Sequence, residues 1–145
     1  MAFHYTRRVQ FSDTDMVGIV HFSMYFRYIE EAEHALWRAA GLPVIQGTDE
    51  AGWPRVSATF DFKNPLRFDD EVEIAVEVSA VSPRTIRYGF TLTRQETPIA
   101  SGSLTAVRAR KVDGGLKALP VPAEIVARLR IATGQLADAG QAGQT

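Results

Sequence analysis

The residues most able to do chemistry lie together in the segment DTDMVGIVHFSMY, residues 13–25. Asp13 and Asp15 are separated by one residue, Gly18 follows, and His21 precedes a segment with helical periodicity. A glycine can adopt positive φ, so the chain can turn here and present backbone N–H groups at a helix N-terminus. Such N–H groups can polarise a carbonyl, and an upstream aspartate can act as nucleophile or general base. The segment therefore predicts an acyl-transfer site.

Two other interpretations of these residues stay open. The two aspartates can simply cap a turn or the entrance of the helix. Asp13, Asp15 and His21 could also ligate a metal, but no further ligand follows at a spacing that would complete the site. We expect no metal and no cofactor.

Composition excludes several other kinds of chemistry. The chain has 145 residues and no cysteine, which rules out disulfides, thiolate zinc sites and a cysteine nucleophile. It contains no G-x-S-x-G, Walker A, G-x-G-x-x-G or H-E-x-x-H pattern. The net charge of −1 gives no reason to expect a nucleic acid or membrane partner. Since no signal peptide or membrane-spanning run is recognisable, we expect a cytoplasmic protein.

Hydrophobic periodicity predicts the elements that position these residues. A helix is expected over 23–40, with Ser23 as N-cap and Gly41 at its end. Its apolar stripe is Tyr25, Tyr28, Ile29, Ala32, Leu36 and Ala39. Strands are expected over 3–11, 55–63, 71–79, 85–94 and 99–112, with a turn at 113–115 and a short helix over 122–132.

This order of elements predicts an α+β fold. Five antiparallel strands would form one sheet, with the long helix on one face. We expect a single domain over 1–133 and a flexible tail over 134–145. One helix cannot cover the whole face, so leftover apolar surface and unpaired sheet edges predict oligomerisation.

The segment FSDTDMVGIVHFSMYFRYIEEA resembles the signature of hotdog-fold thioesterases of the 4-hydroxybenzoyl-CoA thioesterase class. The shared pattern is D-x-D-x-x-G-x-V, then a tyrosine and an amphipathic helix. Residues 55–78 are similar to the second and third strands of that family, and SGSLTAV to its last long strand. The resemblance covers residues 3–130. It implies an antiparallel sheet wrapped around one helix and an acyl-CoA thioesterase activity.

The resemblance also implies roles for the residues of the motif. Asp15 matches the catalytic carboxylate, and Phe22 falls where a backbone N–H polarises the thioester carbonyl. Gly18 matches the turn glycine, and we expect Asp13 to hold the loop by accepting backbone hydrogen bonds. His21 departs from the family pattern. It could orient or protonate a reacting group, or it could be a helix-entry residue bonded to backbone.

Substrate contacts are implied less directly. Such proteins are usually homodimers or homotetramers with the site between subunits. Tyr25 and Glu30 could then face the acyl group, while Ser57, Thr59 and the 44–54 loop would come from the neighbour. Tyr25 can equally be a core residue, and Glu30 a solvated one. The candidate ligands for the CoA phosphates are Arg84, Arg87, Arg110 and Lys111, which could also be ordinary solvated charges.

Three functions remain in order of preference. The first is an acyl-CoA thioesterase, the second a non-catalytic acyl-CoA-binding protein, and the third a hotdog hydratase or dehydratase. The sequence does not define the acyl group.

Overall fold

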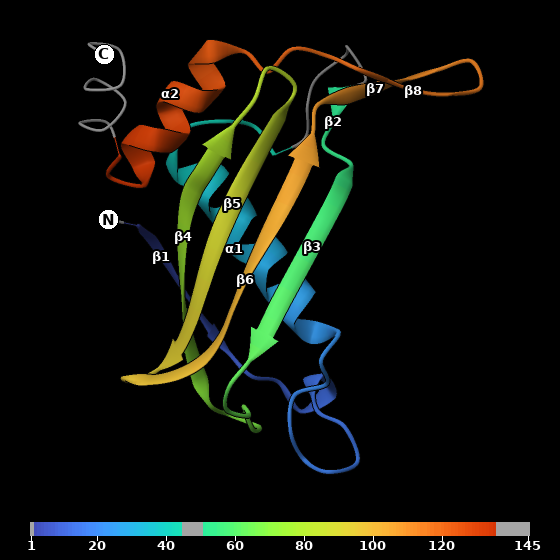
Figure 1. Ribbon diagram of the computed structural model, residues 1–145. Helices are drawn as coiled ribbons and strands as arrows, with labels where there is room; N and C mark the ends of the chain where they lie inside the picture. The colour runs from blue at the N-terminus through green and yellow to red at the C-terminus, as the bar shows by residue number, and fades with distance from the viewer. Residues whose placement is uncertain (1, 45–50, 136–145) are drawn as a thin grey trace.

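One long helix, α1 (Met24–Ala39), lies across one face of a five-stranded antiparallel sheet (Figure 1). This computed structural model describes residues 2–44 and 51–135. The strand order is β1-β4-β5-β6-β3. The bounds are β1 Phe3–Arg8, β3 Arg55–Phe62, β4 Glu71–Val81, β5 Thr85–Arg94 and β6 Thr97–Val107. The expected α+β architecture, with a sheet wrapped around a single helix, is confirmed. The 45–50 part of the expected loop and the tail from 136 lie outside the described residues.

Two strand predictions need correction. β1 ends at Arg8 rather than residue 11, because a 3-10 turn over Phe11–Asp13 follows it. The strand expected over 99–112 is two strands. The chain leaves the main sheet at Arg108, whose N–H donates to the Arg84 carbonyl at 2.9 Å.

Beyond this break a small second sheet forms. β7 (Ala109–Val112) pairs with β2 (Ala51–Gly52) on one side and with β8 (Gly115–Ala118) on the other. The expected turn closes the β7–β8 hairpin, in which Val112 pairs with Gly115. A short helix, α2 (Ala123–Ala132), follows.

The core lies between α1 and the sheet. Strands β4 and β5 alternate buried and exposed residues, so one face of each packs against the helix. The helix stripe was predicted correctly except at its end. Ala39 is exposed, whereas Glu33 and Trp37 are buried. The buried arc runs along these positions because Trp37 packs against Trp53, with ring centroids 5.5 Å apart, and Glu33 pairs with Arg55.

Strand β3 is an edge strand with an apolar, uncovered face. Val56 is 60% exposed and Phe62 50%, while Phe60 is partly buried against Tyr25. The apolar face of this strand is therefore only partly buried within one chain. No helix among the described residues is long and apolar enough to cross a membrane.

Candidate active site

Residues 13–21 form a short antiparallel hairpin at the N-terminal end of α1, the blue loop at the bottom of Figure 1. The His21 N–H donates to the Asp13 carbonyl at 2.9 Å, and the Asp15 N–H donates to the Ile19 carbonyl at 2.9 Å. The two aspartates therefore occupy one arm of the hairpin, and the other arm leads directly into the helix.

The tip of the hairpin is a tight turn from Asp15 to Gly18. The Gly18 N–H donates to the Asp15 carbonyl at 3.0 Å, and Gly18 has φ of 89°. No atom lies within 4 Å of the place where a Cβ would be. Backbone conformation, and not crowding, is what favours glycine here.

The Asp15 carboxylate is half-buried and held from one side. Its Oδ1 accepts the Val17 N–H at 2.9 Å and the Ile19 N–H at 3.4 Å. Within the described part of the chain, no group donates to Oδ2. The carboxylate is thus oriented by the turn and retains one free oxygen, as a nucleophile or a general base requires.

Among the described residues, the backbone N–H of Phe22 is a free donor between the hairpin and the helix. The Val20 N–H donates to the Leu66 carbonyl at 2.8 Å, and the N–H groups of His21 and Ser23 are bonded as well. The Phe22 N–H has no partner among residues 2–44 and 51–135, and it lies at the positive end of the α1 dipole. The Phe22 ring is 62% exposed.

Ser23 is the N-cap residue of the helix, as predicted, but it already has helical angles (φ −64°, ψ −25°) and its side chain makes no capping bond. The side chain of His21 accepts a backbone hydrogen bond there instead. His21 Nδ1 accepts the Ser23 N–H at 3.3 Å and lies 2.8 Å from Ser23 Oγ. The His21 carbonyl accepts the Met24 N–H at 2.9 Å. A helix-entry role for His21 is therefore visible, while a catalytic role stays a prediction.

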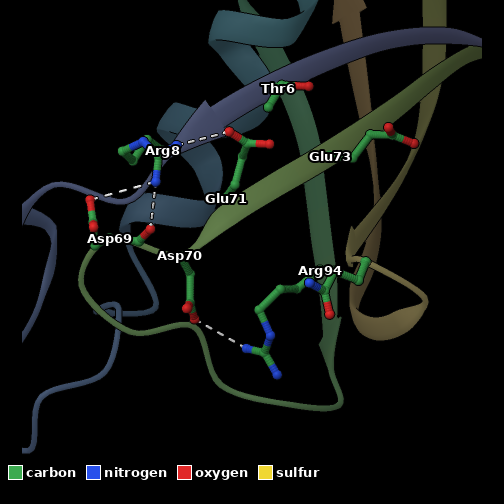
Figure 2. A pocket seen from close by; sticks show the side chains of 8 residues that line it. Thr6, Arg8, Asp69, Asp70, Glu71, Glu73 and Arg94 are labelled. Atoms are coloured by element: carbon green, nitrogen blue, oxygen red, sulfur yellow. Dashed lines mark hydrogen bonds and ion pairs between the residues drawn. The ribbon is translucent and has the colours of Figure 1, made fainter.

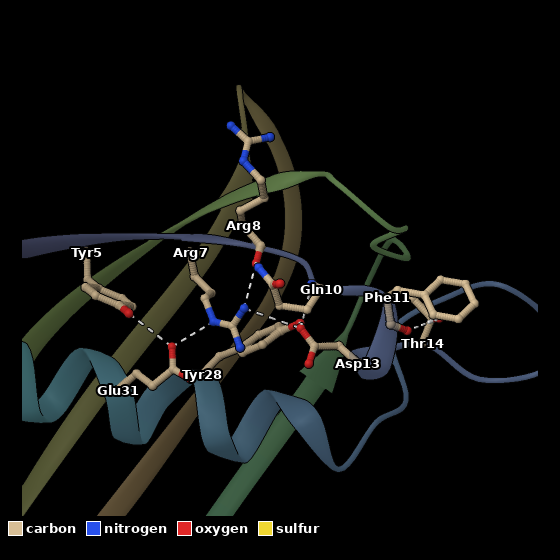
Figure 3. A network of polar contacts seen from close by, with 9 residues as sticks. All are labelled: Tyr5, Arg7, Arg8, Gln10, Phe11, Asp13, Thr14, Tyr28 and Glu31. Atoms are coloured by element: carbon tan, nitrogen blue, oxygen red, sulfur yellow. Dashed lines mark hydrogen bonds and ion pairs between the residues drawn. The ribbon is translucent and has the colours of Figure 1, made fainter.

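Asp13 is buried at the centre of a polar network, drawn in Figure 3. Its Oδ2 accepts the Tyr28 hydroxyl at 2.8 Å and the Gln10 N–H at 2.8 Å, and Arg7 Nη1 lies 3.5 Å away. These partners come from α1, from the segment before the 3-10 turn and from β1. One buried carboxylate thus ties the hairpin to two other elements.

The network extends from Arg7 to the helix surface. Arg7 Nε donates to Glu31 at 2.8 Å, the Tyr5 hydroxyl donates to the same oxygen at 3.0 Å, and the Arg7 guanidinium lies over the Tyr28 ring (Figure 3). Burial raises the pKa of Tyr28, and its bond to Asp13 raises it further. Arg7 and the hydroxyl of Tyr28 were not predicted from the sequence as parts of this site. The available signal was a tyrosine on the apolar stripe, whose buried hydroxyl needs a partner.

Of the expected substrate contacts, Tyr25 lies nearest the hairpin. It is 4% exposed, and its ring meets that of Phe62 edge to face at 4.9 Å. Its hydroxyl is hydrogen-bonded to the Leu66 backbone, and burial raises its pKa. Glu30 is half exposed, and its carboxylate lies 3.5 Å from the Arg55 guanidinium.

Ser57 and Thr59 lie on the other face of the sheet. Phe60 packs against Phe26 of α1, so strand alternation turns Thr59 away from the helix. Thr59 Oγ1 is 3.0 Å from Ser103 Oγ, which also accepts a 3.4 Å bond from Arg87. The structure thus brings Thr59 and Arg87 together, but not to the Asp15 of the same chain.

The remaining phosphate candidates lie at the opposite end of the sheet. Arg84 is in the β4–β5 turn, and Arg110 and Lys111 are on β7, whereas the hairpin lies at the other end (Figure 1). The ten residues of β5 span about 33 Å at roughly 3.3 Å per residue. Contact between these cations and a CoA bound at Asp15 would require a second chain.

A buried ion pair beneath α1 was also missed. Arg55 Nη1 donates to Glu33 Oε2 at 3.0 Å, Nη2 donates to Oε1, and the Glu33 side chain is only 4% exposed. The Tyr88 hydroxyl contacts Glu33 and accepts the Trp37 N–H at 3.0 Å. Glu33 lies on the apolar stripe, and a carboxylate there is the signal for a buried pair.

A surface hollow, shown in Figure 2, is lined mainly by charged side chains, and several of them form ion pairs with one another. Arg8 pairs with Glu71 at 3.0 Å, and Arg94 pairs with Asp70 at 3.2 Å. Arg94 also donates to the Pro65 carbonyl at 2.9 Å, so it braces the turn before β4. Among the described residues, no group of three His, Asp or Glu could hold a metal ion.

Comparison with known proteins gives consistent similarities. Residues 9–129 match the model of the thioesterase-like superfamily. A proposed esterase of Aquifex aeolicus (strain VF5) is 36% identical over 105 residues, covering 71% of this chain and 81% of that protein. The 1,4-dihydroxy-2-naphthoyl-CoA hydrolase of Synechococcus elongatus is 26% identical over 102 residues, covering 68% and 75%.

A solved structure gives the same result. A gentisyl-coenzyme A thioesterase superimposes with a TM-score of 0.77 at 31% identity, covering 87% of this chain and 98% of that one. The family expected from the motif is thereby confirmed. The chain belongs to the thioesterase-like superfamily.

Proposed function

We propose that this protein is an acyl-CoA thioesterase that hydrolyses a thioester to a carboxylic acid and CoA. One observation carries the proposal: among the described residues, Asp15 has a half-buried carboxylate with a free oxygen, and the hairpin that holds it leads directly to the unpaired Phe22 N–H at the start of α1. An acyl-transfer site needs these two groups, a nucleophile or base and a donor for the developing oxyanion.

The reaction can proceed in two ways at this site. As general base, Asp15 takes a proton from water, the hydroxide attacks the carbonyl carbon, and the C–S bond breaks to release CoA thiolate. As nucleophile, Asp15 attacks the carbonyl carbon itself, the C–S bond breaks to release CoA thiolate, and water then hydrolyses the resulting anhydride. In both, the Phe22 N–H stabilises the negative charge on the carbonyl oxygen. Asp13 holds the hairpin, and Gly18 permits its turn.

An aromatic acyl group is the proposed substrate. Two of the similar proteins are named for aromatic thioesters, a dihydroxynaphthoyl-CoA and a gentisyl-CoA. Aromatic side chains gather beside the hairpin of this chain as well, since the rings of Phe60 and Phe62 both meet that of Tyr25. Ring-on-ring contacts of this kind favour a flat aromatic ligand.

The working form is proposed to be a homodimer or a pair of such dimers. An exposed apolar edge strand favours pairing with a second copy. On β3, the side chain of Val56 is 60% exposed and that of Phe62 is 50% exposed. A second chain would also supply the cations that one chain holds at the far end of its sheet. We propose that Arg84, Arg87, Arg110 and Lys111 bind CoA phosphates in this way, and that no cofactor is needed.

The test is a thiol-release assay with DTNB over benzoyl-, acetyl-, octanoyl- and crotonyl-CoA. We expect Asp15→Asn to lower kcat by roughly 10²- to 10⁴-fold, the range for loss of a general base. The matched control is Asp113→Asn, an exposed aspartate in the β7–β8 turn, which should keep full activity.

Other results of the assay would contradict the proposed function or mechanism. Tight binding of acyl-CoA without thiol release would indicate a binding protein. Hydration of crotonyl-CoA without thiol release would indicate a hydratase. A fully active Asp15→Asn variant would remove Asp15 from the mechanism.

A further inference from the structure

An apolar groove lies between α2 and the turn that joins β4 to β5, at the upper end of the sheet in Figure 1. Its volume is about 510 Å³, and Val81 and Val121 form part of the wall opposite the helix. The hairpin that bears Asp15 lies at the other end of β5, a strand that spans about 33 Å at roughly 3.3 Å per residue. Within one chain, the groove is therefore separate from the proposed active site.

The helical wall of the groove is one face of α2. Ala123, Val126, Ala127 and Arg130 line it, and they recur at intervals of three or four residues, so they share a face of the helix. The buried residues of α2, Ile125 and Leu129, lie on its other side against the core. The helix thus packs on the sheet with one face and presents a second, small and mostly apolar face to the groove.

Both walls are anchored to the sheet. The Val121 N–H donates to the Pro83 carbonyl at 2.8 Å, which joins the segment before α2 to the β4–β5 turn. After the helix, the Gln135 side chain accepts the Val78 N–H and donates to the Val78 carbonyl, each at 3.0 Å. Because α2 is tied down at both ends, the position of the groove is a fixed feature of the fold.

One cation lines the groove without a counter-ion. The Nε of Arg130 is buried, and within the described part of the chain it has no hydrogen-bond partner and no carboxylate pairs with its guanidinium. No Asp or Glu occurs among the described residues of the lining. In contrast, Arg128 of the same helix pairs with Glu124 at 3.0 Å and donates to the Gly41 carbonyl at 3.4 Å. A buried N–H of a charged group that lacks a partner favours an anionic ligand.

We propose that this groove binds a carboxylate that carries an aliphatic tail, with the carboxylate on Arg130 and the tail along the valine and alanine side chains. A guanidinium presents paired N–H donors that match the two oxygens of a carboxylate. The described lining beside it contains no aromatic ring, so it offers aliphatic surface for a chain to cover. No residue of the hairpin takes part, so this binding site goes beyond the proposed hydrolysis and does not depend on it.

The test is an NMR titration of the full-length protein with labelled valine and isoleucine methyl groups. Octanoate and octyltrimethylammonium are the probes, because they share a tail and differ in the charge of the head group. The methyl signals of Val121 and Val126 report the groove, and that of Ile19 reports the hairpin, so the two sites are read separately. We expect octanoate to shift the groove signals along a saturable curve and to bind there at least about tenfold more tightly than the cation.

Substitutions on α2 assign the contacts. Arg130→Gln should weaken octanoate binding at the groove at least about tenfold, and Arg130→Lys should weaken it less, because lysine keeps the charge but not the paired donors. Ala127→Glu places a carboxylate on an exposed position of the same wall and should also weaken binding while the helix is retained. Arg128→Gln is the matched control; Arg128 does not line the groove, so its loss should leave the affinity unchanged.

Four results would overturn the proposal. They are unshifted groove signals, equal affinity for the two probes, equal effects of the Arg130 and Arg128 variants, and groove signals that shift on dilution of the protein alone, which would assign the groove to a second copy. The segment after Gln135 carries its own carboxylate, Asp138. Unchanged octanoate affinity in Asp138→Asn is expected, and a rise would assign the groove to that segment instead. If octanoate binds as expected but no acyl-CoA is hydrolysed, the groove stands and the thioesterase function fails.

Discussion

The Tyr28 hydroxyl donates to Asp13 Oδ2 at 2.8 Å, which joins the second turn of α1 to the arm of the hairpin that also bears Asp15. Both side chains are buried, so the bond is shielded from water. Asp13 accepts the Gln10 N–H through the same oxygen. The position of the proposed catalytic carboxylate therefore depends on a carboxylate two residues earlier, whose own position is set by the helix.

Removal of that hydroxyl should weaken both stability and activity. Tyr28→Phe leaves the buried Asp13 carboxylate one donor short, which should cost about 1.5–3 kcal/mol of unfolding free energy, the range for a hydrogen bond to a charged group. Tyr5→Phe is the matched control, because its partner Glu31 is 36% exposed and can bond water instead; it should cost less than about 1 kcal/mol. Urea unfolding of both variants measures the free energy lost in each. Similar losses would show that burial of the acceptor carboxylate does not determine the strength of these hydrogen bonds.

The two interpretations of His21 can be separated by substitution. His21→Ala removes the acceptor of the Ser23 N–H and should cost about 1 kcal/mol, as for loss of a helix cap. His21→Asn restores a capping acceptor but no imidazole. If His21 only caps, the asparagine variant keeps kcat and its pH profile. A loss of kcat together with a change in the pH profile in His21→Asn, at unchanged stability, would assign an acid–base role.

Removal of Arg55 should lower the free energy of unfolding more than removal of Glu33 does. The Glu33 side chain is 4% exposed and Arg55 30%, so Arg55→Met strands a carboxylate away from water, whereas Glu33→Gln leaves an arginine that water can reach. We expect Arg55→Met to cost about 3 kcal/mol, the lower end of the range for breaking a buried pair, and Glu33→Gln clearly less. The Glu33→Leu, Arg55→Met double variant should recover part of the loss. A double-mutant cycle by urea unfolding tests this, and equal single losses would contradict it.

Alkaline pH should destabilise the protein through its tyrosines. Burial raises the pKa of all four, Tyr5, Tyr25, Tyr28 and Tyr88. An unfolded tyrosine releases its proton near pH 10, while the folded one keeps it. The contribution of these tyrosines to the unfolding free energy should therefore be fully present below about pH 10 and fall above it. The fall should reach up to about 1.4 kcal/mol per pH unit for a fully buried tyrosine such as Tyr88.

Two measurements check this pH dependence. Tyrosinate absorbance of the native protein should rise only well above the ordinary midpoint. Unfolding free energies from neutral pH to about pH 11 should decline less steeply in Tyr88→Phe than in the wild type. A native tyrosine titration with an ordinary midpoint would contradict the expectation.

Local patterns in the sequence determined most of the elements and the identity of the motif. Period-2 alternation in 71–79 and 85–94 and the stripe from Tyr25 to Leu36 predicted β4, β5 and α1, because those patterns follow from how each backbone orients successive side chains. Gly18 could also be recognised locally as a turn residue, because glycine adopts positive φ readily. The order of elements and the Asp–Gly–helix motif were together sufficient to predict the fold and the family.

Contacts between distant segments were decided only by the tertiary structure. No local pattern could show that Arg108 would leave the main sheet, or that Arg7 and Tyr28 would meet at Asp13. Each depends on which partner lies within about 3 Å after folding, and the energy of a hydrogen bond or ion pair depends on burial at that place. Asp15 and Phe22 could be recognised as candidates from the sequence. Only the folded chain shows that, within residues 2–44 and 51–135, Asp15 Oδ2 and the Phe22 N–H have no partner while most neighbouring polar groups have one.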